Sequence, residues 1–444
     1  IRAGMKEEFL HFIWKYGLYD RDKLLDNEGN QITVLHPGEY NRDSGPDFFN
    51  ARIISGGTIW AGNIEIHTMS SHFDIHGHQH DPMFDNIILH VVAKNDRKIF
   101  NSRGEEILTT ELCFEEAIYD KYLSLVNNPF AIACHEELAA YSPVLLRNWI
   151  DALIIERLEA KSGHIESLLV KTGNDWEETF YNVLARYFGF RVNTGPFEML
   201  ARALPVKIIR RHSDNRFQVE ALLYGTAGML SEGLFRDAIN DTYYRDLIRE
   251  YKILSSKYSL QPLHGWIWKF ARLRPANFPT IRISQLAGML SGPEGLFSKI
   301  IEIRDIDSLR TLFGVKASSY WDDHYTFGTA RNGKTKKTGE KSADIIIINA
   351  VVPVLYVYGK QRAQAEYSER AVSLLEQTEY EDNSVIRDWC ETGISIVTAL
   401  ESQALLQLRD CYCRKRRCLD CRVGFSLLSS GKKFKEQDEL ILEP

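Results

Sequence analysis

The feature that most constrains the fold of this chain is a predicted β-hairpin near its N-terminus. Residues 48–54 (FFNARII) and 58–68 (TIWAGNIEIHT) are rich in the β-branched and aromatic residues that strands favour. Gly56 and Gly57 lie between them and supply the positive φ angles of a tight turn. The neighbouring elements predicted from the same patterns are a helix over 6–16, a strand over 32–40, a central strand over 85–94 and a weaker strand over 107–112.

Two carboxylates and a histidine are predicted to meet at one end of this hairpin. Glu65 and His67 share a strand face because side chains alternate, whereas Ile64 and Ile66 point into the core. Asp47 opens the partner strand, and the turn folds it back towards Glu65. Two carboxylates and a backbone carbonyl form the hard-oxygen site that Mg²⁺ or Mn²⁺ prefers. The alternative is that Asp47 caps a turn and that Glu65 and His67 lie on a solvated sheet face.

The dipeptide Pro-Asp at 46–47 and the tripeptide Glu-Ile-His at 65–67 resemble the signature of the PD-(D/E)XK nuclease superfamily. The predicted helix and strands resemble the core of that superfamily over about residues 5–115. The resemblance implies a metal-dependent phosphodiesterase that acts on DNA or RNA. It implies that Asp47 and Glu65 bind the metal and that the carbonyl of Ile66 completes the coordination.

Two further positions follow from this resemblance. An additional upstream acid is expected, and either Glu39 or Glu8 could supply it. His67 stands where the superfamily has lysine, and a neutral imidazole does not supply a fixed positive charge. The site is therefore either an altered nuclease centre or a fold retained for binding.

Five segments spread along the chain carry a second, broader resemblance: SGPDFFNARI, GNIEIHTMSSHFDIHGHQHDP, ILHVVAKND, WIWKFARLRPANFPTIRISQLA and CYCRKRRCLDCRVG. They are similar to an uncharacterised bacterial family of about this length, which is catalogued only as a domain of unknown function. This resemblance covers nearly the whole chain and implies no activity.

The connection after the hairpin holds six of the 13 histidines: His67, His72, His76, His78, His80 and His90. Imidazoles at this density favour Zn²⁺ or another borderline metal, and His76, His78 and His80 are the candidate ligands. The alternative is that single histidines bind backbone carbonyls within a tight loop. A zinc hydrolase built on this loop alone is a weaker hypothesis, because the sequence has no H-E-x-x-H motif.

Four of the seven cysteines form a C-x-C-x4-C-x2-C pattern near the C-terminus: Cys411, Cys413, Cys418 and Cys421. The C-x2-C spacing is typical of a zinc knuckle, and an iron–sulfur cluster is the less favoured alternative. A residue from elsewhere could replace Cys411 as the fourth ligand. The basic residues 414–417 are expected to lower the thiol pKa values and so to favour metal binding. The alternative is a set of free thiols at a helix end.

Helical periodicity begins near residue 141, and two basic segments interrupt the helices. Arg272, Arg274 and Arg282 lie near aromatic residues, and Lys336 and Lys337 lie in a predicted mobile loop over 331–341. Guanidinium groups among aromatic rings suit phosphate contact and base stacking. The alternative is that the aromatics are core residues and that the arginines pair with acids.

Composition limits the class of protein. The 444 residues carry a net charge of −6, which excludes a global attraction to nucleic acid or anionic membranes. The longest apolar run, 345–358, is predicted to be too short to cross a bilayer and to be broken by Asn349 and Pro353. We therefore expect a cytoplasmic protein that does not bind membranes, and the oligomeric state stays open.

The patterns together predict an α+β protein in three parts. They are a restriction-endonuclease-like domain with a mixed sheet over 5–140, a mainly helical domain over 141–410 and a cysteine-rich metal knuckle over 411–444. The leading functional hypothesis is a metal-dependent nuclease or a nucleic-acid-binding relative of one. The alternative is a non-catalytic scaffold in which metal ions only stabilise the fold.

Overall fold

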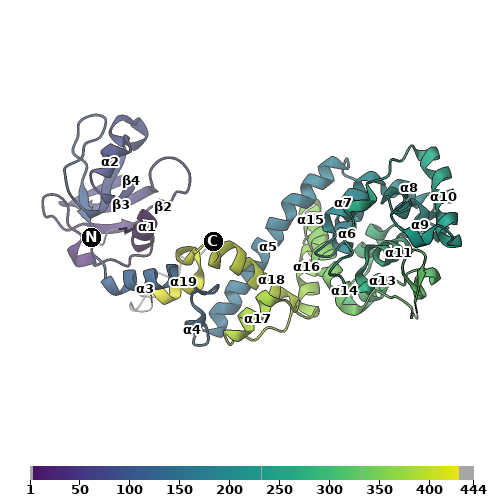
Figure 1. The fold of residues 1–444 in the computed structure, drawn as a ribbon. Helices are drawn as coiled ribbons and strands as arrows, with labels where there is room; N and C mark the ends of the chain where they lie inside the picture. The colour runs from purple at the N-terminus through teal and green to yellow at the C-terminus, as the bar shows by residue number, and fades with distance from the viewer. Residues whose placement is uncertain (1–3, 232, 332, 430–444) are drawn as a thin grey trace. The chain divides into compact units, whose positions relative to one another are not determined.

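The computed structural model describes residues 4–231, 233–331 and 333–429. The chain forms two compact units (Figure 1). Unit 1 contains the described residues up to Tyr141 together with those from Arg409 onward, and unit 2 contains Ser142–Leu408. The mixed α+β composition predicted from the sequence is confirmed, with an N-terminal mixed sheet and a mostly helical remainder. The cysteine-rich segment belongs to the same unit as the sheet.

Unit 1 is built on a mixed sheet with the strand order β1-β3-β4-β5-β6, and β2 pairs with β3. The strands are β1 (Thr33–His36), β2 (Glu39–Tyr40), β3 (Phe48–Ser55), β4 (Thr58–Met69), β5 (Ile87–Lys94) and β6 (Thr109–Glu111). The hairpin β3–β4 is antiparallel, as its Gly-Gly turn predicts, whereas β4, β5 and β6 are parallel. Parallel neighbours need a crossover connection, so the histidine-rich segment after β4, with helix α2 (His72–Ile75), returns the chain to the start of β5.

The main core of unit 1 lies between helix α1 (Glu7–Lys15) and the sheet. The apolar residues Phe9, Leu10, Ile13 and Trp14 recur at helical spacing on α1 and pack in one cluster with Ile64, Ile66, Leu89 and Val91 of β4 and β5. Helices α3 (Glu116–Val126) and α19 (Arg422–Ser429) add residues to this cluster, and α4 (His135–Leu138) follows α3.

A second, smaller core forms around Phe73 of α2. The Phe73 ring lies 6.4 Å from the His67 ring and 5.4 Å from the His90 ring, measured between centroids. Because Glu65 and His67 alternate with the core residues Ile64 and Ile66, both face the connection that carries α2. The strand pattern thus directs the polar residues of β4 towards the histidine-rich segment.

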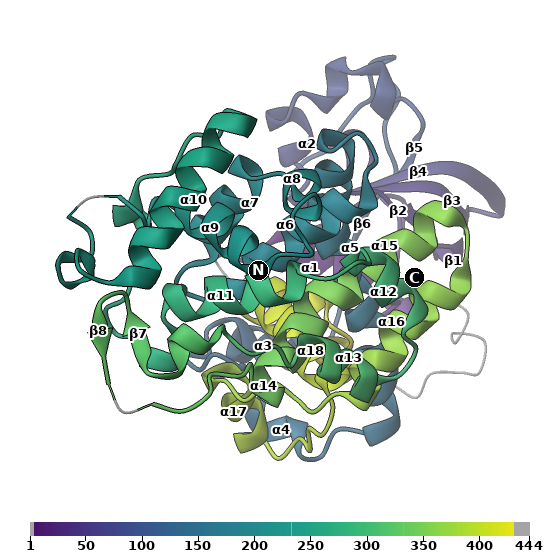
Figure 2. The same ribbon diagram turned by 90° about the vertical axis from the view of Figure 1, so that its right-hand side faces the viewer.

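Unit 2 is mostly helical. Its helices are α5 (Pro143–Lys171), α6 (Trp176–Phe188), α7 (Thr194–Ala203), α8 (Val206–Arg210), α9 (Arg216–Thr226), α10 (Thr242–Tyr258), α11 (Pro279–Leu290), α12 (Leu296–Glu302), α13 (Ile306–Phe313), α14 (Glu340–Ile346), α15 (Val352–Arg362), α16 (Ala365–Gln377), α17 (Ser384–Glu391) and α18 (Ala399–Leu408). Strands β7 (His324–Thr326) and β8 (Thr329–Ala330) form a short hairpin. Helix α9 packs against α10 and α11 (Figure 2), and α5 packs against α15 and α18.

The apolar segment of unit 2 differs from its prediction. Asn349 and Pro353 do not break it, because the π-helical stretch Ile347–Val351 joins α14 to α15 and places Pro353 in the first turn of α15, where its missing N–H is tolerated. The resulting helix, Glu340–Arg362, has 23 residues and could cross a membrane by length and composition. Its most apolar window is 78% buried inside the protein, as in a core helix.

Candidate metal centre

The two acidic residues of the hairpin meet where β3 begins. The backbone N–H of Asp47 donates to Glu65 Oε2 at 3.2 Å, and the backbone N–H of Ile66 donates to Asp47 Oδ2 at 2.8 Å. The pairing of Phe48 with Ile64 sets this register. The structure therefore places Asp47 beside Glu65, which is 5% exposed.

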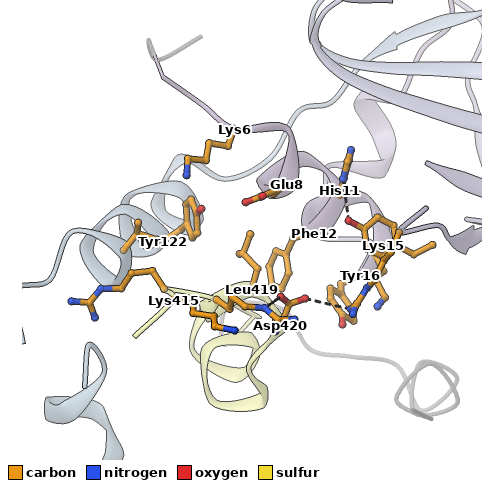
Figure 3. Close-up of a pocket in the computed structure, with 15 residues that line it drawn as sticks. Lys6, Glu8, His11, Phe12, Lys15, Tyr16, Tyr122, Lys415, Leu419 and Asp420 are labelled. Atoms are coloured by element: carbon orange, nitrogen blue, oxygen red, sulfur yellow. Dashed lines mark hydrogen bonds and ion pairs between the residues drawn. The ribbon is translucent and has the colours of Figure 1, made fainter. Parts of the chain in front are cut away.

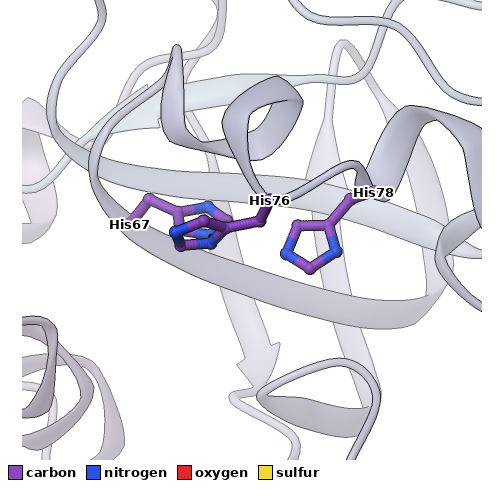
Figure 4. Close-up of side chains that lie close together, drawn as sticks. All are labelled: His67, His76 and His78. Atoms are coloured by element: carbon purple, nitrogen blue, oxygen red, sulfur yellow. The ribbon is translucent and has the colours of Figure 1, made fainter.

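Three histidines join this pair of carboxylates. His67 on β4, His76 at the end of α2 and His78 in the following turn place one ring nitrogen each within 4.8 Å of one another (Figure 4). The His67 Nε2 and His76 Nδ1 atoms lie 3.0 Å apart. Glu65 Oε1 lies 3.7 Å from His67 Nε2 and 3.4 Å from His78 Nε2. The hairpin and the histidine-rich connection, which sequence patterns suggest as two sites, form one cluster.

The three histidine donors could hold one metal ion, and Glu65 Oε1 approaches two of them. Tetrahedral Zn²⁺ has bonds of about 2.0–2.2 Å to nitrogen and oxygen, which places neighbouring donors about 3.3–3.6 Å apart. The three observed donor–donor distances of 3.0, 3.4 and 3.7 Å bracket this range. His67 is 1% exposed, but the His76 side chain is exposed, so the cluster reaches solvent on one side. His80, predicted as a third loop ligand, is exposed and lies outside the group.

Burial determines the protonation of the cluster. It raises the pKa of Glu65 to about 9, with the charge of Asp47 as the second cause. It lowers the pKa of His67 to about 2, with His90 as the second cause. At neutral pH Glu65 therefore holds a proton and His67 is a neutral imidazole, which is the form that binds metals. A divalent cation would replace the Glu65 proton and restore the carboxylate.

One outer residue orients the His67 ring. His90 Nε2 lies 2.8 Å from His67 Nδ1, so the second nitrogen of His67 is held while Nε2 faces the other donors. Such outer contacts fix the orientation and tautomer of a ligand histidine. His90 was not among the predicted site residues. Its position opposite Glu65 in the parallel pairing of β4 and β5 is the signal that could have identified it.

Helix α1 supplies two more neighbours that the sequence did not single out. His11 Nε2 lies 3.2 Å from Asp47 Oδ2, and Glu7 Oε1 lies 3.5 Å from His72 Nδ1. Glu7 and His11 are four residues apart and so share one face of α1. Glu7 is therefore the acid of α1 that faces the histidine-rich connection.

The two acids predicted for the upstream role lie elsewhere. Glu39 is exposed on β2, and Glu8 lines a neighbouring pocket. The reason is the geometry of α1, in which consecutive residues point about 100° apart, so that Glu7 and Glu8 face different surroundings.

The C-terminal cysteines lie near a thiol that the sequence pattern does not contain. Burial raises the pKa of Cys134 to about 12, with Cys421 and Cys418 as the next causes. Burial also raises the pKa of Cys413, with Cys421, Cys134 and Cys418 as further causes. Cys134, Cys413, Cys418 and Cys421 are thus close enough to interact electrostatically. Cys411 is half-buried within the π-helical stretch Arg409–Cys413.

The expected lowering of the thiol pKa values by basic residues is found for Arg416, but burial outweighs it. Burial raises the pKa of Cys418 to about 11 and also raises that of Cys413. Arg416 lowers both values, but the loss of hydration outweighs its charge. Cys134, Cys413 and Cys418 are therefore protonated at neutral pH unless a metal displaces the protons.

Two of the five residues predicted to contact nucleic acid are buried. Arg282 is 5% exposed, donates to Gln285 and Asn277, and stacks on the Phe190 ring. Lys336 is 6% exposed and donates from Nζ to the backbone carbonyl of Asp322 at 2.8 Å. Burial leaves little of either cation open to a phosphate, and their role in nucleic-acid binding stays a prediction.

The remaining three cations, Arg272, Arg274 and Lys337, are exposed, so their role in nucleic-acid binding stays a prediction. Trp266, which precedes the two arginines, is 79% exposed. Helix α11 begins at Pro279 after a single 3₁₀ turn, Pro275–Asn277.

Comparison with known proteins gives one match. A family model described as a protein of unknown function (DUF2851) matches residues 7–384. Searches of the curated proteins and of the solved structures find no similar protein. The match includes the sheet of unit 1, the histidine-rich connection and most of unit 2. This chain therefore belongs to the DUF2851 family, whose function is unknown.

Proposed function

We propose that unit 1 holds a divalent metal ion and acts on phosphodiester bonds of nucleic acid. The observation that carries the proposal is the group of His67, His76 and His78, one ring nitrogen of each lying within 4.8 Å of the others, with Glu65 Oε1 within 4 Å of His67 and His78. Three nitrogens and one oxygen favour Mn²⁺ or Zn²⁺ over Mg²⁺, which prefers an all-oxygen octahedron. The centre thus differs from the hard-oxygen site expected from the hairpin alone.

The PD-(D/E)XK resemblance supports the reaction class. The helix α1, the antiparallel pair β3–β4 and the crossover to the parallel strand β5 follow the expected order of elements. In hydrolysis, a water oxygen bonds to phosphorus, one P–O ester bond breaks, and the proton of the water moves to the leaving oxygen. A bound metal ion would polarise the phosphoryl oxygen and acidify the water.

Residues around the donor group suit proton transfer. Asp47 Oδ2 accepts the Ile66 N–H, which holds the carboxylate in place, and lies 3.2 Å from His11 Nε2. A histidine paired with a carboxylate is a common general base, because the carboxylate stabilises the imidazolium that forms. We assign this role to His11 and the positioning role to Asp47.

A structural metal site is the second candidate, and one observation favours it. Glu65 and His67 are almost fully buried, as ligands of a closed structural site are. In that case the protein would be a binding or scaffold protein. The exposed His76 side chain argues for the catalytic alternative, because it leaves one side of the cluster open.

A second metal site at the C-terminal cysteines is part of the proposal. The bound group would be Zn²⁺ or, as the less favoured option, an iron–sulfur cluster, with Cys413, Cys418 and Cys421 as ligands. Cys134 is a better fourth ligand than Cys411, because it interacts with the other three thiols. The cytoplasmic location, where such thiols stay reduced, is kept as part of the same proposal.

Cleavage assays with matched variants test the proposal. Wild-type protein, His76→Ala and the control His80→Ala would each be incubated with single- and double-stranded DNA and RNA in Mn²⁺, Zn²⁺ or Mg²⁺. We expect Mn²⁺- or Zn²⁺-dependent cleavage that His76→Ala abolishes and His80→Ala retains, with unchanged circular dichroism. An inert wild type that nevertheless binds the metal would leave only the structural alternative.

A further inference from the structure

A polar pocket beside the candidate metal centre is strongly cationic. The cavity has a volume of about 500 Å³ and is formed by α1, β2 and the C-terminal segment before α19 (Figure 3). Only two acidic side chains, Glu8 and Asp420, are among the residues that line it. The cationic lining residues are Lys6, Lys15, Arg42, Lys415, Arg416 and Arg417. Since the whole chain carries a net charge of −6, this concentration of positive charge is local.

The cations of the pocket are only partly neutralised. Asp420 accepts from Arg417 at 2.9 Å and from Arg42 at 3.5 Å, so one acid serves two arginines. Lys15 lies over the ring of Tyr40, 5.6 Å from its centroid, and burial together with the charge of Arg42 lowers its pKa. Lys6 and Lys415 are exposed, and none of the ion pairs among the described residues involves them. The pocket therefore has charge available for an anion.

The pocket and the candidate metal centre share a wall. His11 lines the pocket, its Nδ1 lies 3.3 Å from Tyr40 Oη, and its Nε2 faces Asp47. Tyr16 and Tyr40 add aromatic rings to the lining. Cations suit a phosphate group and aromatic rings suit a base, and a cavity of this size accepts a small ligand but not a double helix.

We propose that this pocket binds a phosphorylated nucleotide unit, either as the end of a single strand or as a free nucleotide. The inference rests on the proposed function, which gives nucleic acid as the substrate. It adds that the pocket binds single-stranded ends more tightly than duplex. Binding in the pocket requires no metal, so it can be measured separately from cleavage.

Fluorescence anisotropy in EDTA tests the inference with a short labelled oligothymidylate that carries a terminal phosphate. The double variant Lys6→Glu/Lys415→Glu should weaken binding about tenfold, which corresponds to about 1.4 kcal/mol, because it reverses two exposed charges of the pocket. The control Lys94→Glu, an exposed lysine outside the pocket, should change affinity less than about twofold. Glu8→Gln should tighten binding, because it removes a negative charge from the lining.

Competition separates the sources of the ligand. If thymidine monophosphate displaces the labelled strand, a free nucleotide is sufficient for binding. If only the unlabelled phosphorylated strand displaces it, the ligand is a strand end. Both results support binding in the pocket. The inference would be overturned if the protein bound an oligonucleotide with a terminal hydroxyl, or a blunt duplex, as tightly as the phosphorylated strand. It would also be overturned if the double variant bound the phosphorylated strand as tightly as the wild type. A protein that binds in EDTA but never cleaves would refute the proposed catalysis and leave the pocket assignment standing.

Discussion

Removal of His76 should weaken metal binding and reduce the thermal stabilisation that the metal confers on unit 1. The perturbation is His76→Ala, with His80→Ala as the control, and the probe is Mn²⁺ because sulfur ligands, which the C-terminal cysteines would supply, favour softer ions. His76 Nδ1 lies 3.0 Å from His67 Nε2, whereas His80 is outside the donor group. Both changes remove an exposed imidazole two residues from His78.

The magnitude follows from linkage between binding and folding. A metal ion at 100 times its dissociation constant stabilises the folded state by about 2.7 kcal/mol. For unit 1, whose described residues are 4–141 and 409–429, this corresponds to a rise in Tm of about 5–11 °C, since about 2–4 °C per kcal/mol is typical of this size. Loss of an outer partner already weakens metal binding about 10–100-fold, so loss of a ligand should cost at least that much. At the same Mn²⁺ concentration, bound metal should then raise the free energy of unfolding of His76→Ala by at most about 1.4 kcal/mol.

Differential scanning calorimetry of chelator-treated protein, with and without Mn²⁺, is the assay. We expect the full Mn²⁺-dependent rise in Tm for wild type and His80→Ala. For His76→Ala we expect less than about half of that rise. The reasoning is refuted if wild type shows no Mn²⁺-dependent shift, or if His80→Ala loses as much of the shift as His76→Ala. Titration calorimetry on the same three proteins would verify that the stability change reflects affinity.

Two further predictions concern the cysteines and a buried lysine. Protein purified without chelator should contain one equivalent of zinc or iron that Cys413→Ala loses and that the control Cys390→Ala, an exposed thiol, retains; equal metal content in both variants would contradict the cysteine site. Burial, followed by the charge of Arg157, lowers the pKa of Lys161 to about 7, so the folded state releases this proton at lower pH than the unfolded state does. The free energy of unfolding should therefore rise between pH 7 and pH 9, by at most about 1.4 kcal/mol per pH unit from this group. Urea denaturation should show that Lys161→Met flattens this rise and that the exposed control Lys252→Met does not, and an unchanged slope in Lys161→Met would refute the assignment.

The sequence predicts the hairpin part of the site because the relevant rule is local. Alternation along β4 and a Gly-Gly turn are enough to place Asp47 beside Glu65. The same rules cannot place His76 and His78, because their position depends on how the crossover folds over the sheet after Phe73 enters the second core. Periodicity carries no information on that tertiary step, so two sites were predicted where the structure has one cluster.

Long-range packing explains the other differences. Arg282 has the charge of a surface residue, and only the fold reveals that the Phe190 ring and two side-chain acceptors surround its guanidinium group. Cys134 lies far from the cysteine pattern in sequence, and it joins that group only because the C-terminal segment returns to unit 1. A spacing pattern shows which cysteines lie close together in sequence, but it cannot show that a thiol from another part of the chain lies near them.

The histidine at position 67 is better explained by the cluster than by the loss of a lysine. Its side chain is 1% exposed and lies among His76, His78 and His90, with Glu65 as the acid that its ring approaches within 4 Å. A lysine ammonium there would face three imidazoles and would be costly to bury, whereas a neutral imidazole can bind a cation that Glu65 also binds. The positive charge that lysine supplies in the resembling superfamily would then come from the metal ion itself. If unit 1 binds the metal proposed above, His67 would mark a change from a hard ion held by oxygen to a borderline ion held mainly by nitrogen.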